Sequence, residues 1–219
     1  MAVDTLSFTV NGEAVSVAVE ADEMLSDVLR IRLGLTGTKI ACQEDECGAC
    51  TVLLDGEPVL SCNYPALKAA GRKVRTIEGL AKDGVLHPLQ EAFVRHGAVQ
   101  CGFCIPGQLM TAVALLERSP SPSEEEVRHA LKDTLCRCAG YPTILRAIQD
   151  AAGSLRTGAP LSGPPVKGAD DLAVIGRVVP RPDAIDKVTG AARYADDLAF
   201  PGMLHAAVLR AGEPHAILR

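Results

Sequence analysis

The sequence contains no tryptophan and only 3% aromatic residues, so it offers little from which to build a deep aromatic pocket for a substrate. It also lacks a basic excess: its formal net charge is -5, which argues against binding to nucleic acid phosphates. No apolar run is long enough for a membrane span. The N-terminus does not show the basic stretch and apolar run of an export signal. We therefore expect a cytoplasmic protein with no nucleic acid partner and no membrane span.

What the sequence does have is eight cysteines in 219 residues. Cytoplasmic thiols are kept reduced, so disulfides are not their expected use. Hydrophobic residues make up 47% of the chain, which is enough to bury a core and argues against disorder. Metal binding is therefore the leading explanation of the cysteines, and another protein is the expected macromolecular partner.

Residues 1–79 show the pattern of a small α+β domain. Two segments of alternating apolar and polar residues flank Asn11-Gly12, a dipeptide suited to a tight hairpin turn. From Met24, apolar residues recur at helical spacing until Gly34, which predicts one amphipathic helix. Further strands are expected at 51–54, from the Asp55-Gly56 turn to near Cys62, and around 73–77.

Residues 80–155 show the pattern of an all-helical domain. Helices are expected after His87-Pro88, over 107–118, from Ser123, where Ser123 and Glu126 have the spacing of a capping box, and over 142–154. Four short helices can hide their apolar faces only by packing on one another, which predicts a four-helix bundle.

The remaining residues divide into two segments. Residues 156–171 are rich in Gly and Pro and have no apolar period, which predicts an extended linker. Residues 172–219 are too few for an independent core, so we expect them to pack on something else.

The first cysteine set is Cys42-x4-Cys47-x2-Cys50, followed by Cys62. Three cysteines in a tight loop and a fourth from a neighbouring strand are the plant-type ferredoxin arrangement for a 2Fe-2S cluster. Small residues between Cys47 and Cys50 let backbone amides approach the sulfurs. A structural zinc site is the alternative, but zinc sites usually have two short cysteine pairs, and one is missing here.

The second set joins Cys101-x2-Cys104 to Cys136-x-Cys138. Each pair precedes a predicted helix, so the four thiols can meet at one end of the bundle. Taken alone this set is also compatible with zinc. Beside a plant-type set that uses all the other cysteines, a second 2Fe-2S cluster is better supported.

Three stretches around these cysteines closely resemble the small iron-sulfur subunit of the xanthine oxidase family of molybdenum hydroxylases. They are LGLTGTKIACQEDECGACTVLLDG, HPLQEAFVRHGAVQCGFCIPG and TLCRCAGYPTI, and the resemblance covers about residues 4–155. It implies an N-terminal β-grasp, ferredoxin-like domain whose cluster faces a flavin. It also implies a helical domain whose cluster faces a molybdopterin-type molybdenum cofactor.

The resemblance further implies a role for this chain as the electron-transfer subunit of a hydroxylase or dehydrogenase of the xanthine dehydrogenase or aldehyde oxidoreductase type. Electrons would pass from the molybdenum-pterin centre through the two clusters to FAD or another acceptor. The implied partners are a large subunit that binds the molybdenum cofactor and a subunit that binds FAD. Gln100 and the main chain of Cys138 would contact the pterin; the alternative for Gln100 is a helix cap.

Substrate chemistry is not expected on this chain, because its five histidines have no partners at catalytic or ligand spacing and no nucleophile motif is present. Three alternatives stay open. The chain could belong to a reductive family member such as a hydroxybenzoyl-CoA reductase type dehydroxylase, or serve many partners as a free ferredoxin. It could also be a zinc-stabilised adaptor whose cysteines only hold the fold.

The chain departs from the family pattern beside the first cysteine set. Ala41 and Asp45 stand where the family usually has glycine. Asp tolerates a left-handed backbone, whereas Ala41 would be strained by a positive φ. The acidic run Glu44-Asp45-Glu46 next to an anionic cluster leads to the hypothesis that the first cluster has a lowered potential; a solvated loop without effect is the alternative.

The C-terminal stretch IGRVVPRPDAIDKVTGAARYADDLAFPGMLHAAVLR resembles the start of the molybdenum-binding subunit of the same family. We therefore expect residues from Gly176 onward to dock as part of the partner's fold. An unrelated flexible tail is the alternative, because the Pro and Gly content would fit one.

Overall fold

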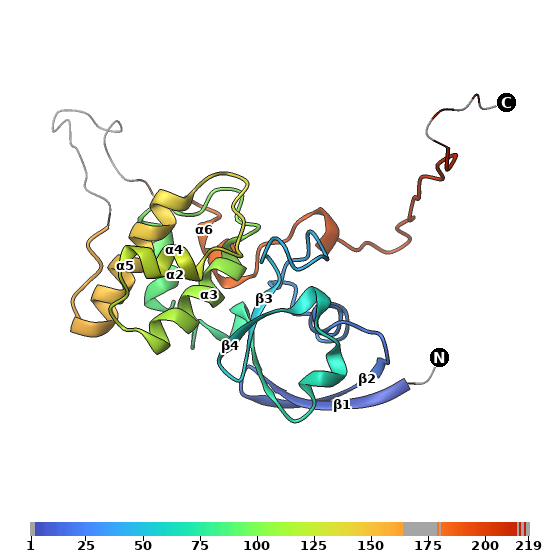
Figure 1. The fold of residues 1–219 in the computed structure, drawn as a ribbon, viewed down its shortest axis with the longest axis horizontal. Coiled ribbons are helices and arrows are strands. Elements are labelled where there is room, and N and C mark those ends of the chain that lie inside the picture. The colour runs from blue at the N-terminus through green and yellow to red at the C-terminus, as the bar shows by residue number, and fades with distance from the viewer. Residues whose placement is uncertain (1–2, 164–178, 180, 214, 216, 218–219) are drawn as a thin grey trace.

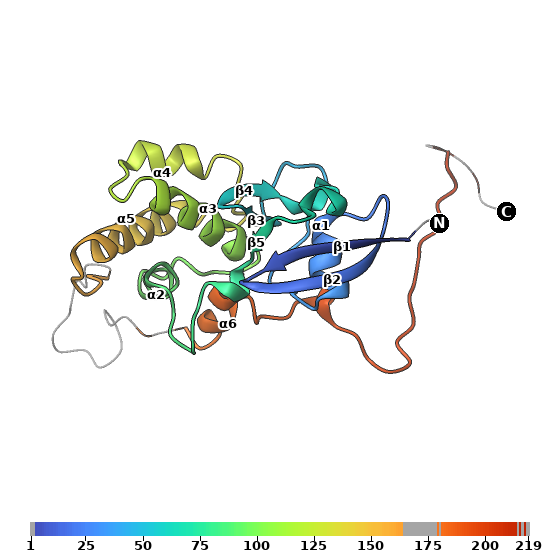
Figure 2. The ribbon, with the colours of Figure 1, turned by 90° about the horizontal axis from the view of Figure 1, so that it is seen from below.

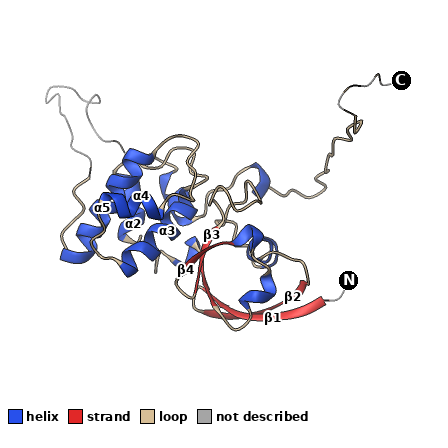
Figure 3. Cartoon of the chain, in the orientation of Figure 1, coloured by secondary structure: helices blue, strands red, loops and turns tan. Residues whose placement is uncertain are grey.

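The computed structural model describes residues 3–163 and 181–213, together with residues 179, 215 and 217. Two units lie side by side in it (Figure 1). A sheet with short helices is formed by residues 3–79, here called the sheet unit, and a group of helices by residues 80–157, the helical unit (Figure 3). The predicted α+β class is confirmed. Within the described residues, no helix is both long and apolar enough to cross a membrane.

The sheet unit is built on one mixed sheet of five strands within residues 3–79. The strands are β1 (Val3–Val10), β2 (Glu13–Glu20), β3 (Thr51–Leu54), β4 (Glu57–Leu60) and β5 (Lys73–Arg75). Their order is β2-β1-β5-β3-β4, with β1 and β5 parallel and the other neighbours antiparallel. The predicted hairpin is confirmed, because Asn11 and Gly12 both take the positive φ angles of a tight turn.

The helix of the sheet unit differs from the expected regular helix. It begins as α1 and continues as a π-helical segment, in which the N–H of Leu33 donates to the carbonyl of Val28. Hydrophobic spacing could not distinguish the two geometries, since either brings these apolar residues to one face. The elements are α1 (Leu25–Asp27), η1 (Val28–Arg32), and three short 3-10 turns, η2 (Ser61–Asn63), η3 (Ala66–Ala69) and η4 (Ile77–Gly79).

The helical unit contains the predicted helices, each close to its expected position. They are α2 (Pro88–Arg95), α3 (Ile105–Arg118), α4 (Glu124–Ala130) and α5 (Tyr141–Thr157). The predicted capping box at Ser123 is confirmed: its hydroxyl accepts from the N–H of Glu126, whose carboxylate accepts from the N–H of Ser123. Helix α2 packs against α3 and α5, and α4 packs against the same two. Almost every residue of α3 is buried.

The two units meet where α3 packs on β3. Leu53 of β3 belongs to the buried cluster of the helical unit, whereas most other buried residues of the sheet unit form a separate cluster. A pair of glycines permits the close approach. A Cβ on Gly107 would lie 2.2 Å from the carbonyl oxygen of Gly48, and one on Gly48 would lie 2.2 Å from that of Asp133. The junction therefore has no room for a single added carbon.

The C-terminal segment lies partly along this junction. The second half of the predicted linker, residues 164–171, falls outside the described residues, and its first two residues, 156 and 157, still belong to α5. Residues 181–198 follow the boundary between the units, with α6 (Ala184–Thr189) beside α2 and α3, and then η5 (Ala195–Asp197) (Figure 2). The segment finds buried contacts on both units of its own chain, and its docking as part of a partner's fold stays a prediction. Beyond Leu198 the chain runs away from both units.

Candidate iron-sulfur centres

The first cysteine set lies in the irregular loop before β3 and in the turn η2 after β4. Cys50 and Cys62 are buried, and Cys42 and Cys47 are partly exposed. The loop turns through left-handed φ angles at Gln43 (58°), Asp45 (59°) and Gly48 (67°). Asp45 thus takes the conformation considered for it, while the strain considered for Ala41 does not arise.

The thiols of this set lie near one another, with Cys42 beside Cys47, and Cys50 influenced by both Cys62 and Cys47. Desolvation raises the pKa of Cys42, but backbone N–H groups of residues 44, 46 and 47 outweigh it and bring the pKa to about 7. Burial, with the neighbouring thiol of Cys62, raises the pKa of Cys50 to about 12. Binding a metal centre would therefore displace a proton from Cys50.

The second set lies at the starts of α3 and α5. Cys104 and Cys136 are buried, Cys138 is partly exposed and Cys101 is exposed. These thiols also lie near one another, with Cys101 beside Cys138 and Cys104 beside Cys136, and Cys101 influences Cys104 as well. Burial raises the pKa of Cys104, and a hydrogen bond from the Cys101 backbone lowers that of Cys138. Burial also raises the pKa of Cys101, so Cys138 is the one thiol of this set whose pKa is shifted downward.

Both sets fit a binuclear cluster in their donors and in the groups around them. A 2Fe-2S cluster takes four cysteine thiolates, and the four thiols of each set would supply them. Backbone N–H groups already point at sulfur: that of Glu44 lies 3.5 Å from Cys42 Sγ and that of Gly140 lies 3.3 Å from Cys136 Sγ. Among the described residues, no three His, Cys, Asp or Glu side chains gather around a point that could hold a single metal ion.

A backbone hydrogen bond connects the two cysteine sets. The backbone N–H of Leu135, the residue before Cys136, donates to the carbonyl oxygen of Cys47 at 2.9 Å. Close by, Nε2 of the fully buried Gln108 donates to the carbonyl of Thr134 at 3.0 Å. Sequence reasoning missed this link, because it joins residues 88 positions apart and involves no side chain whose type could have signalled it.

Gln100 is exposed and lies beside the second set. Its Nε2 is 3.5 Å from the position that a Cβ on Gly140 would take, and Cys136 Sγ is 3.7 Å from the same position. The alternative role as a cap of α3 is not seen, since Cys104 occupies the cap position and no side chain caps that end. The backbone carbonyl of Gln100 accepts a hydrogen bond from Lys187 Nζ at 3.1 Å.

A groove opens beside the first set. Its volume is about 540 Å³, and it reaches Cys42 and Cys47. Apolar and basic side chains from the helical unit form the other wall: Arg128, Leu131, Lys132, Leu135, Tyr141 and Leu145. The partly exposed thiols of the first set are thus reachable from solvent through a surface that both units build.

Known proteins match both units. Residues 8–78 match a family model described as a 2Fe-2S iron-sulfur cluster binding domain, and residues 76–149 match one described as a 2Fe-2S binding domain. The chain is 54% identical over 146 residues to the nicotine 6-hydroxylase small subunit of Paenarthrobacter nicotinovorans. That match covers 67% of this chain and 88% of the relative.

A longer relative matches nearly the whole chain. The aldehyde oxidoreductase of Megalodesulfovibrio gigas is 42% identical over 217 residues, a match that covers 96% of this chain and 24% of that protein. The structure of aldehyde oxidoreductase from Desulfovibrio gigas is similar with a TM-score of 0.79 at 41% identity, covering 89% of this chain and 22% of that one. The chain thus spans about a quarter of the length of these oxidoreductases.

Proposed function

The chain belongs to the 2Fe-2S iron-sulfur proteins of the molybdenum hydroxylase family, and on that premise we propose that it relays single electrons between two clusters. The observation that carries this proposal is the 2.9 Å hydrogen bond from the Leu135 N–H to the Cys47 carbonyl. It joins the two cysteine sets through a short stretch of backbone. When bound, the clusters supply the one-electron chemistry.

Eight cysteines are the proposed ligands, four for each 2Fe-2S cluster. The first cluster would bind in a β-grasp, ferredoxin-like domain, residues 1–79, and the second in a four-helix bundle, residues 80–155. Buried thiols fix the cluster in the protein, and directed N–H groups stabilise its negative charge. The proposed ligands are Cys42, Cys47, Cys50 and Cys62 for the first cluster, and Cys101, Cys104, Cys136 and Cys138 for the second.

We propose a direction for the relay from the surroundings of the two sets. Gln100 and the main chain of Cys138 stand at an exposed edge of the second set, suited to contact the pterin of a molybdenum cofactor held mainly by a large partner subunit. The groove at Cys42 and Cys47 offers the first set to an acceptor, FAD on another subunit or a different carrier. Electrons would then enter at the second set and leave from the first.

The activity of the whole assembly is also a proposal. The names of the two relatives point to oxidation of an aldehyde or a nicotine-type compound, with substrate chemistry on the partner chain. Neither name favours a reductive dehydroxylase or a zinc adaptor. Residues 172–219 would correspond to the start of the molybdenum-binding part, because the match to the aldehyde oxidoreductase covers 96% of this chain. We place the assembly in the cytoplasm.

Metal analysis of the purified chain tests the relay. We expect about two iron and two sulfide per cluster, visible colour, and two separate one-electron steps in an anaerobic titration monitored by electron paramagnetic resonance. Stoichiometric zinc in a colourless protein would overturn the proposal. Co-purification with a large molybdenum-containing subunit tests the partner, and isolation of the chain alone from cells that contain that subunit would count against it.

A further inference from the structure

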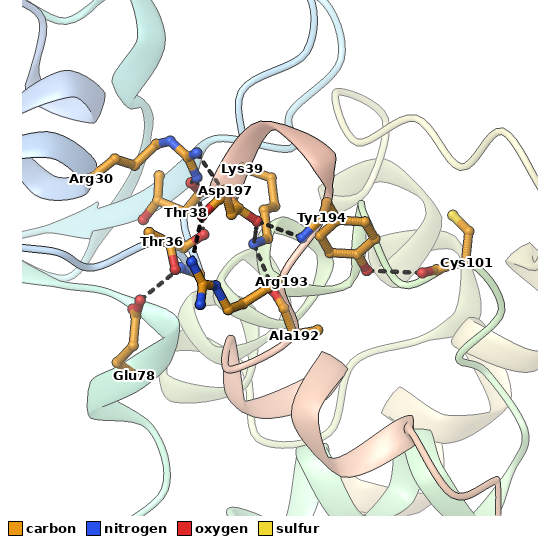
Figure 4. A network of polar contacts seen from close by, with 11 residues as sticks. Arg30, Thr36, Thr38, Lys39, Glu78, Cys101, Ala192, Arg193, Tyr194 and Asp197 are labelled. Carbon is orange, nitrogen blue, oxygen red and sulfur yellow. Dashed lines mark hydrogen bonds and ion pairs between the residues drawn. The ribbon is translucent and has the colours of Figure 1, made fainter. Parts of the chain in front are cut away.

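Residues 183–198, here called the clasp, bind both units at once. On the sheet unit, the Asp197 carboxylate accepts from Arg30 at 2.6 Å and from Lys39 Nζ at 2.8 Å (Figure 4). Lys39 Nζ also donates to the carbonyl of Ala192 at 3.0 Å. The side chains of Lys39 and Asp197 are each only 2% exposed, so this ion pair is buried between the clasp and the sheet unit.

On the helical unit, the clasp covers the loop that carries Cys101. The hydroxyl of Tyr194 donates to the carbonyl of Cys101 at 2.8 Å, as Figure 4 shows, and its ring meets Phe103 edge to face at 5.2 Å. Lys187 Nζ donates to the Gln100 carbonyl at 3.1 Å. Tyr194 and Asp197 are three residues apart, so a single turn, η5, holds the contacts to both units.

The surface beneath the clasp is shaped for close contact. A Cβ on Gly102 would lie 2.5 Å from side-chain carbons of Lys187 and 2.7 Å from the hydroxyl of Tyr194. From the other side, a Cβ on Gly190 would lie 2.5 Å from Ile77 and 3.0 Å from the Cα of Gly37. Glycines on both faces of the contact allow the clasp to approach the two units closely, which indicates a closely packed interface.

The charges of the contact are complementary and enclosed. Burial raises the pKa of Asp197, but hydrogen bonds from Lys39, the Tyr194 N–H and Arg30 outweigh it and bring the pKa to about 2. Burial lowers the pKa of Lys39, and the Asp197 carboxylate opposes this. Removing one partner of such a pair leaves the other charge buried without compensation, which is far more costly than losing an exposed pair.

We propose that the junction of the two units carries a specific docking surface for the clasp, formed by Arg30, Lys39, Phe103 and the backbone of residues 100–102, with Asp197 as its main anchor. The clasp occupies this surface without needing the covalent connection through residues 164–180. Side-chain and backbone contacts hold it, so a separate chain carrying the same segment would bind in the same way. The proposal goes beyond the relay, because it concerns association of polypeptide segments with or without clusters.

A cut chain tests this directly. A recognition sequence for a specific protease is inserted after Gly163 in the full chain, and the purified protein is cleaved. We expect the C-terminal fragment to stay bound through gel filtration at micromolar concentration. Elution of the fragment apart from the remainder would overturn the proposal.

Exchange with labelled peptides then identifies the anchor without altering the folded protein. A peptide of residues 181–198 should displace the bound fragment, and its D197N form should bind roughly 100-fold more weakly, as loss of one partner of a buried ion pair predicts. Y194F should weaken binding roughly 3- to 10-fold, the value of one hydrogen bond. D196N changes a neighbouring exposed carboxylate and should bind like the unmodified peptide.

Equal binding of the D197N and D196N peptides would refute the role of Asp197. Because peptide exchange reports association alone, it can fail while both clusters assemble normally, and the converse also holds. Failure of the docking surface and failure of the relay are therefore distinguishable.

Discussion

The two cysteine sets gather four thiols by different physical means. In the first set, Cys42, Cys47 and Cys50 lie within nine residues, and left-handed backbone at Gln43 and Asp45 curls the loop. In the second set the pairs are separated by 31 residues and meet only because α2 and α4 each pack against both α3 and α5. The first arrangement depends on local backbone conformation, and the second on tertiary packing. The two sets should therefore fail independently.

The largest expected effect comes from removing one buried thiol from each set. C50S should abolish the first cluster and C104S the second, so that each variant loses about half of its iron and one of two paramagnetic signals. Metal analysis and electron paramagnetic resonance check this. Loss of both signals from either variant would show that the two sets do not assemble independently.

The junction between the sets should be the next most sensitive place. G107A places a carbon 2.2 Å from the Gly48 carbonyl, so we expect a loss of about 1 to 3 kcal/mol in unfolding free energy from overpacking. The matched control is G153A in α5, where a Cβ would meet no atom within 4 Å. That change should leave stability unchanged or raise it by up to about 1 kcal/mol, since Ala favours helix. Denaturant unfolding compares the two variants.

Packing of α5 should depend on pH through Asp150. Its Oδ2 lies 2.8 Å from Nε2 of His96, the residue that caps the C-terminal end of α2. Burial raises the pKa of Asp150, but hydrogen bonds from His96, Ser162 and Gly163 outweigh it and bring the pKa to about 2. Because the folded pKa lies below the unfolded one, the ionised form stabilises the fold above about pH 4, and this contribution is lost as the pH falls toward 2.

D150N should accordingly cost roughly 2 kcal/mol at pH 7, about half of that at pH 3, and little near pH 2. Thermal unfolding of wild type and variant across this range measures the difference. The control D133N alters an exposed carboxylate and should change stability by less than about 0.5 kcal/mol at each of these pH values. A D150N effect that is constant with pH would contradict the assignment.

Removing acidic charge beside the first set should have the smallest effect, and that effect is on the potential of the first cluster. Glu44 and Glu46 are exposed beside the first set. E44Q combined with E46Q should raise the potential of the first cluster by the equivalent of less than about 1 kcal/mol, since solvent and salt screen exposed charges. The potential of the second cluster should not move. A redox titration in low and high salt checks both statements, with E125Q as a remote control.

The sequence predicted the features whose causes are local. Asn11-Gly12 encodes its own turn, and Ser123 with Glu126 encodes its own cap, so both were found without any knowledge of the rest of the chain. The π-helical geometry of η1 was missed, because hydrophobic spacing marks a buried face and not the hydrogen-bond pattern. Cysteine spacing likewise divided the thiols into two sets, and the assignment of each as a ligand stays a prediction.

The contacts that join the two sets could not be predicted, because they are long-range. The Leu135 to Cys47 hydrogen bond uses only backbone groups, which every residue possesses. Asp197 and Lys39 are 158 positions apart, and nothing in the sequence around either residue indicates that the two will form a buried ion pair. Such pairs become visible only when the fold has brought distant segments together.

The segment that follows the clasp has a consequence for the order of assembly. Leu204, Val208 and Leu209 are 92%, 85% and 99% exposed, on a stretch that pairs with no strand among the described residues. An extended apolar stretch with unsatisfied backbone groups pairs readily with a second copy of itself. Once the clasp has docked, this apolar stretch stays exposed to solvent. A partner surface that covers the stretch would have to bind it before a second copy of the chain does. We therefore expect more assembled protein when this chain is synthesised together with a partner that carries such a surface than when it is synthesised alone.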